Sequence, residues 1–167
     1  MSNPSLQSAP RPVVSNTTPL ISLAGVKLLH LLPAIYGEIW IPSAVYNEYQ
    51  VGRTSHPDSP DLDTLPWLRV HHVGFHPDVP TSLDAGEAAA ISLALSSAAR
   101  LALLDETRAR RIAARLGLPI AGSLTVLIEA KRRGHIPLVT PIVDQMIAQG
   151  RRISDRLRMT VLQLAGE

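Results

Sequence analysis

Five oxygen-bearing side chains are spaced along the sequence so that they follow or flank the strands of one predicted sheet. Asn16, Asp105 and Ser123 each come just after a short apolar run. Glu48 lies near the end of a predicted helix, and Glu87 lies in the first turn of another. Because the carboxyl ends of parallel strands meet at one edge of a sheet, we expect these side chains to form a ring of oxygens there.

The chemistry that suits such a ring is the binding of a hard cation. Carboxylates that are gathered together repel one another unless a cation neutralises them. Oxygen ligands with few imidazoles favour Mg²⁺ or Mn²⁺, which retain water ligands and bind phosphate. The chain has no Cys, which excludes disulfides, zinc ligated by thiolates, iron–sulfur clusters and thiol nucleophiles.

Four of these residues also have a structural interpretation, which the sequence leaves open. Asp84-Ala-Gly-Glu87 has the spacing of a capping box, in which Glu87 closes the start of its own helix. Asp105 and Ser123 could each be a helix N-cap, and Asn16 could form a turn. The joint placement of the residues at one sheet edge favours the interpretation as ligands.

A second candidate metal site contains His71, His72, His76 and Asp78. Adjacent residues of a strand point to opposite faces, so His71 and His72 cannot both ligate one ion without distortion. The sequence also lacks G-x-G-x-x-G, Walker and G-x-S-x-G motifs. Their absence disfavours dinucleotide binding, NTP hydrolysis by a P-loop and serine hydrolysis.

Positive charge is concentrated in the C-terminal part of the chain. Residues 1–99 hold 4 Lys or Arg and 8 Asp or Glu, whereas residues 100–167 hold 12 and 6. Most of these cations are Arg, which binds phosphate bidentately. A polyanionic partner would contact the group formed by Arg108, Arg110, Arg111 and Arg115, three of which share one helix face. The alternative is an ordinary solvated surface.

The elements that would position these side chains alternate between strand and helix. Apolar runs predict strands over 12–15, 38–41, 68–73, 101–104 and 119–121. Helices are predicted from Thr17 onward and over 42–49, 83–97, 106–116, 123–133, 140–149 and 154–164, with a loop over 51–66. The strands are apolar throughout, as in strands that helices cover on both faces. We therefore predict a three-layer α/β/α fold with a central, mostly parallel sheet of four to five strands.

The length and composition are typical of one globular domain. The chain has 167 residues, of which 46% are apolar and 18% charged, and this argues against intrinsic disorder. We expect a flexible N-terminal tail over 1–11 and a single domain over 12–167, with 139–165 as a C-terminal helical extension. No apolar run approaches the ~18 residues of a membrane span, and the start lacks a signal-peptide pattern, so we expect a cytoplasmic protein without a membrane partner.

Five short blocks of the sequence, in order, resemble the PIN domain nucleases. The blocks are Val13–Ile21, Ile41–Glu48, Leu83–Ile91, Leu104–Arg111 and Gly122–Leu127. The likeness covers about residues 12–135. The ending from Ile153 to Glu167 resembles a prokaryotic PIN subgroup related to VapC-type toxins.

The resemblance implies a Mg²⁺- or Mn²⁺-dependent endoribonuclease in which a metal-activated water cleaves RNA phosphodiesters. Carried over position by position, it implies that Asn16, Glu48, Glu87 and Asp105 are the metal ligands and that Ser123 hydrogen bonds near the metal or phosphate. It also implies the toxin of a toxin–antitoxin pair, with a small antitoxin protein as partner and a homodimer as the oligomeric state.

Asn16 departs from the general pattern of the family, which has Asp after the first strand. An amide oxygen still coordinates Mg²⁺, but the site has one negative charge fewer. Two alternatives follow. One is a PIN-like protein that binds nucleic acid and has lost cleavage, and the other is an oligomeric assembly module built on the apolar helices.

Overall fold

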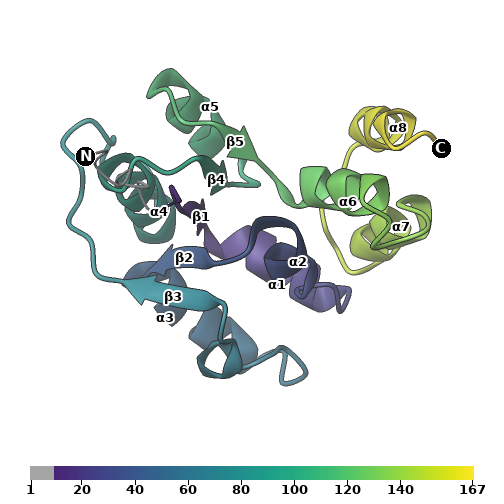
Figure 1. Ribbon diagram of the computed structural model, residues 1–167, viewed down its shortest axis with the longest axis horizontal. Helices are drawn as coiled ribbons and strands as arrows, with labels where there is room; N and C mark the ends of the chain where they lie inside the picture. Colours follow the sequence, from purple (N-terminus) through teal and green to yellow (C-terminus); the bar gives the residue numbers. More distant parts are fainter. Residues whose placement is uncertain (1–9) are drawn as a thin grey trace, which may run out of the picture.

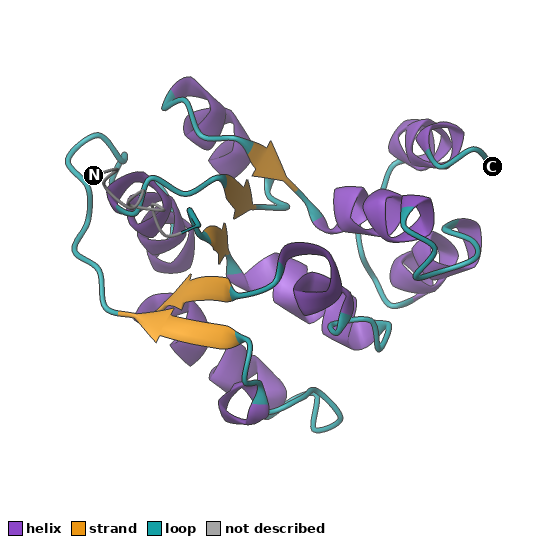
Figure 2. Cartoon of the chain, in the orientation of Figure 1, coloured by secondary structure: helices purple, strands orange, loops and turns teal. Residues whose placement is uncertain are grey.

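The computed structural model describes residues 10–167, and its core is a five-stranded parallel sheet. The strands are β1 (Val13–Ser15), β2 (Ile39–Pro42), β3 (Leu68–His71), β4 (Leu101–Leu103) and β5 (Ile120–Ala121). Their order is β3-β2-β1-β4-β5, and every neighbouring pair is parallel. Figure 2 shows the strands in the middle of the molecule with helices around them, so the predicted three-layer α/β/α class is confirmed. The predicted N-terminal tail lies outside the described residues, apart from its last two positions.

Eight α-helices surround the sheet in the described part of the chain. They are α1 (Thr17–Gly25), α2 (Leu31–Tyr36), α3 (Ser43–Arg53), α4 (Ala85–Ser96), α5 (Thr107–Arg115), α6 (Ser123–Arg132), α7 (Thr140–Ala148) and α8 (Asp155–Leu164), and a 3-10 turn spans Leu62–Thr64. Helices α6, α7 and α8 lie together at one end of the molecule, away from α4 (Figure 1). Within residues 10–167, no helix combines the length and the apolar character needed to cross a membrane.

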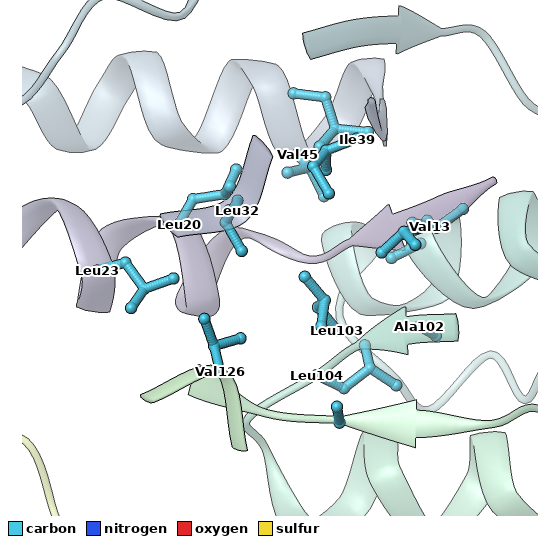
Figure 3. Close-up of a cluster of buried hydrophobic side chains, with 14 of the residues drawn as sticks. Val13, Leu20, Leu23, Leu32, Ile39, Val45, Ala102, Leu103, Leu104 and Val126 are labelled. Carbon is cyan, nitrogen blue, oxygen red and sulfur yellow. The ribbon is translucent and has the colours of Figure 1, made fainter. Parts of the chain in front are cut away.

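Helices cover both faces of the central strands. All three residues of β1 are buried, although successive side chains of a strand point to opposite faces. Helix α4 packs against β1, β2 and β4, and α2 packs against β2. Leu20 and Leu23 of α1 gather with Leu32 of α2 and Val126 of α6 in the fully buried core (Figure 3).

The boundaries of most elements agree with the sequence prediction to within one or two residues, and two differ more. Helix α3 continues to Arg53, into the predicted loop over 51–66, because the Arg53 guanidinium binds Gln50 one turn earlier and pairs with Asp61. Helix α2 was not predicted, because it is only 6 residues long and contains Pro33. Its Leu31, Leu32 and Ile35 are buried, so tertiary packing stabilises it.

The register of the sheet places three strand ends at the same level. Ser15 pairs with Leu103, and Leu103 pairs with Ala121. The Asn16 backbone N–H donates to the Leu103 carbonyl at 3.0 Å, which extends the pairing past the end of β1. The residues that follow β1, β4 and β5 therefore lie next to one another at the carboxyl edge of the sheet.

Candidate functional site

Asp105 follows β4 and is held by the first turn of α6. Its Oδ1 accepts hydrogen bonds from the Ser123 backbone N–H at 2.7 Å and from the Ser123 hydroxyl at 3.1 Å. The N-caps of α5 and α6 are Glu106 and Gly122, so neither Asp105 nor Ser123 has the N-cap position considered for it. Gly122 is needed for the close approach, because a Cβ there would lie 2.8 Å from Asp105 Oδ1.

Two arginine side chains reach the corner occupied by Asp105. Arg151 Nη2 lies 3.2 Å from Asp105 Oδ2, and the Asp105 side chain is only 10% exposed. Arg110 Nη1 donates to the Leu104 carbonyl at 2.8 Å and would lie 3.0 Å from a Cβ on Gly122. Arg110 is therefore turned toward the sheet edge. The charge of Asp105 is neutralised by a guanidinium of the chain itself.

Asn16 lies between β1 and α1 and is 3% exposed. It has the N-cap position of α1, but its side chain makes no capping hydrogen bond. Asn16 Oδ1 is buried and has no hydrogen-bond partner among the described residues. A buried acceptor left unpaired is costly, so this oxygen is available to a ligand in a way that a turn-forming amide is not.

Glu48 joins the starts of two helices near this edge. Thr17, the neighbour of Asn16, donates its hydroxyl to Glu48 Oε2 at 2.5 Å. The Glu48 carboxylate also lies against Gly86 in the first turn of α4, where a Cβ would overlap both carboxylate oxygens. Glu48 is therefore positioned by α1 on one side and by α4 on the other.

Glu87 forms the capping box that the sequence offered as its alternative role. Its backbone N–H donates to Asp84 Oδ1 at 2.8 Å, and the Asp84 N–H returns a longer bond of 3.4 Å to Glu87 Oε2. Glu87 is 8% exposed. Burial raises the pKa of its carboxyl group, and the negative charges of Asp84 and Glu106 raise it further.

These contacts connect three of the four predicted ligands, Asn16, Asp105 and Glu48, around the edge of the sheet, whereas, among the described residues, the Glu87 side chain bonds only to Asp84. Asn16 is bonded to the strand that precedes Asp105, and its neighbour Thr17 is bonded to Glu48. Within residues 10–167, however, no three His, Asp or Glu side chains form a group placed to hold a metal ion. The donors that the edge does offer, an unpaired amide oxygen and carboxylates, are of the hard type that Mg²⁺ and Mn²⁺ prefer.

The histidines of the second candidate metal site contact different partners. The His71 ring stacks on Trp40 with a centroid distance of 3.9 Å, and His71 Nε2 is buried without a partner in the described chain. His72 Nδ1 lies 2.8 Å from the Ser43 hydroxyl, and His76 Nδ1 lies 3.8 Å from Asp78 Oδ2. Each histidine therefore has a different partner, and the structure does not gather these residues into one group that could hold a metal ion within residues 10–167.

A groove lined by arginines runs along α5. Its volume is about 620 Å³, and its lining residues are Pro80, Ser82, Thr107, Arg108, Arg111, Ile112 and Arg115. Arg108, Arg111 and Arg115 are exposed, so the structure brings these three together and leaves Arg110 apart from them.

Sequence reasoning missed Thr17, Gly86 and Arg151. Gly86 stands inside the Asp84-to-Glu87 motif, where a small residue beside an acidic pair was the available signal. Arg151 is 46 residues from Asp105 in the chain, and nothing in the spacing links them.

A comparison with known families gives a match that covers most of the chain. A family model described as DUF3368: PIN domain matches residues 12–167. The matched region includes α7 and α8, so it extends beyond the likeness seen in the sequence blocks. No curated protein matches the chain.

Proposed function

The chain belongs to the PIN domain nuclease superfamily, and we propose that it is a metal-dependent endoribonuclease whose site is the carboxyl edge of β1, β4 and β5. The observation that carries the proposal is the buried, unpaired Oδ1 of Asn16, whose backbone is bonded to the last residue of β4, the strand that Asp105 follows. A divalent cation bound at this edge would satisfy this oxygen.

The proposed ligands for Mg²⁺ or Mn²⁺ are Asn16, Glu48, Glu87 and Asp105. When bound, a divalent cation supplies positive charge against a phosphate and lowers the pKa of a water ligand. The protein's own contribution is to orient the donors. Ser123 fixes the Asp105 carboxylate through its N–H and its hydroxyl, and Thr17 fixes Glu48.

The charge distribution favours a nucleic acid as substrate, and the resemblance to PIN nucleases makes RNA the class that we propose. The groove along α5 carries Arg108, Arg111 and Arg115, and α5 begins two residues after Asp105. A single strand that followed the groove would place its phosphates on guanidinium groups close to the acidic edge. This arrangement supports a nuclease that binds RNA next to its proposed metal ligands.

We further propose that the protein is the toxin of a toxin–antitoxin pair and acts as a homodimer in the cytoplasm. A small antitoxin protein would be its partner. The exposed apolar side chains of α8, Leu157, Met159 and Leu164, provide surface for such protein contacts.

A second candidate is a PIN-like RNA-binding protein without cleavage. The observation that favours it is the Arg151 ion pair, which supplies the counter-charge of Asp105 from within the chain. Together with the neutral amide of Asn16, this pair lowers the electrostatic need for a cation.

Cleavage of a mixed RNA by purified protein, with Mn²⁺ or with a chelator, tests the proposal. We expect cleavage that requires Mn²⁺, that is lost in Asp105→Asn and that persists in Asp144→Asn, a matched control in α7 whose carboxylate pairs with Arg158. RNA binding without any cleavage would favour the second candidate. Cleavage that survives in Asp105→Asn would overturn the proposed site.

A further inference from the structure

Arg151 links the C-terminal helices to the proposed site, and we propose that it is a substrate-binding residue that contacts a phosphate of the bound nucleic acid. The inference rests on the proposed function in taking nucleic acid as the ligand. It holds for a nuclease and for a non-cleaving RNA-binding protein alike. It adds to the site a residue that lies outside the five sequence blocks.

The backbone at Arg151 is fixed by the end of α7. Gly150 has a φ of +92°, and the Arg151 N–H donates to the carbonyl of Met146, a residue only 1% exposed, at 3.0 Å. The preceding Gln149 donates its side-chain amide to the Gly25 carbonyl at the end of α1, at 2.9 Å. Arg151 is therefore aimed at the sheet edge by two helix ends, unlike an arginine on a free surface.

The guanidinium of Arg151 keeps most of its donors available. An arginine has five N–H donors, and the one side-chain hydrogen bond of Arg151 within residues 10–167 runs from Nη2 to Asp105 Oδ2. The Arg151 side chain is 32% exposed, whereas the Asp105 side chain is 10% exposed. The remaining donors thus have access to a ligand that approaches from solvent.

Two guanidinium groups lie at the corner occupied by Asp105. Asp105 accepts from Arg151, and the Arg110 guanidinium lies within the same corner, bonded to the neighbouring Leu104 carbonyl. In the described chain, Asp105 is the only carboxylate paired with either guanidinium. The Arg110 guanidinium has no carboxylate partner among residues 10–167, and a planar guanidinium with free donors binds phosphate oxygens bidentately.

The alternative is that the ion pair only tethers α7 and α8 to the sheet. The two roles differ in one measurable respect. A tether affects the stability of the protein, whereas a phosphate contact contributes to the affinity for RNA and to its salt dependence.

The test measures binding of a labelled single-stranded RNA of mixed sequence, in chelator, over a range of KCl concentrations. We expect Arg151→Gln to weaken RNA binding about tenfold, as for the loss of one charged hydrogen bond. The slope of log K against log salt concentration should become shallower by ~0.7, the contribution of one phosphate contact to a single strand. Arg151→Lys should restore the salt slope. Arg152→Gln is the matched control, because it removes the same charge from the next residue, which is exposed.

Melting curves of the same proteins separate the outcomes. A lower melting temperature for Arg151→Gln with unchanged RNA affinity and slope would overturn the assignment and leave a tether. Equal losses in Arg151→Gln and Arg152→Gln would also overturn it. If the wild-type protein cleaves RNA while Arg151→Gln binds it normally, only this inference fails. If the wild-type protein neither binds nor cleaves RNA, the proposed function fails and this inference fails with it.

Discussion

Glu87 has two roles: it closes the start of α4 through the capping box, and its own carboxylate is buried. Its capping bonds are compatible with Gln, which occupies the same position in capping boxes. The substitution Glu87→Gln should therefore keep the cap and remove only the buried charge. We expect it to raise the melting temperature of the metal-free protein by a few degrees at neutral pH.

The pH dependence follows from the raised pKa of the Glu87 carboxyl group. A carboxyl group whose pKa is higher in the folded state destabilises that state once it ionises. The advantage of Glu87→Gln should thus vanish below the unfolded pKa of 4.5, grow as the pH rises from there to the higher folded pKa, and stay constant above it. Melting curves between pH 4 and 8 check this, and an advantage that is independent of pH would show that the buried charge is not the cause.

At the residue level, the sequence predicted the members of the edge whose position follows from strand topology. Asn16, Asp105 and Ser123 each follow a strand, so parallel pairing was enough to bring them near one another. The capping role of Glu87 was readable from local spacing. The contacts of Thr17 and Arg151 were not, because they depend on how α3 packs against α1 and on how the end of α7 is bonded to the end of α1.

At the level of elements, the start of α4 is shaped around the carboxylate of Glu48. We predict that Gly86→Ala destabilises the protein by about 1–3 kcal/mol, because the new Cβ overlaps the Glu48 oxygens and must displace them. Gly52→Ala in α3 is the control, since its Cβ would meet only Ile21 at 3.9 Å.

The control should stabilise the protein by about 0.5–1 kcal/mol through helix propensity. Denaturant unfolding measures both variants. Equal stabilisation by the two substitutions would mean that Glu48 is free to move away from α4, and that the first turn of this helix does not position it.

Sequence patterns failed to predict one short helix and the end of another. Helix α2 has 6 residues and no capping signal, and its apolar residues became helical through burial against the sheet and α6. Helix α3 extends beyond its predicted end because Arg53 bonds to Gln50 in the helix and pairs with Asp61 in the following loop. In both cases a tertiary contact outweighs the local pattern.

At the scale of the whole molecule, the arginine groove along α5 is the surface expected to receive RNA. We predict that replacing both Arg111 and Arg115 by Ala makes RNA affinity less dependent on salt. The slope of log K against log salt concentration should become shallower by ~0.7 for each phosphate that the variant no longer binds. Arg108 is left in place because its charge acts on Glu87.

The matched control replaces Arg152 and Arg156, two exposed arginines of the C-terminal segment, by Ala. Binding of a single-stranded RNA at several salt concentrations measures all three proteins. The same slope for the α5 variant and the wild-type protein would identify the groove as ordinary solvated surface.

The proposed nuclease site requires the unpaired oxygen of Asn16 to bind a metal ion. Calorimetric titration of Mn²⁺ into the wild-type protein and Asn16→Asp tests this most directly. In a site that lacks one negative charge, Asp places a full charge where the amide placed a dipole, so the variant should bind Mn²⁺ about tenfold more tightly or better. Equal Mn²⁺ affinity, together with a lowered melting temperature, would contradict the ligand role of Asn16 and the metal-dependent nuclease built on it.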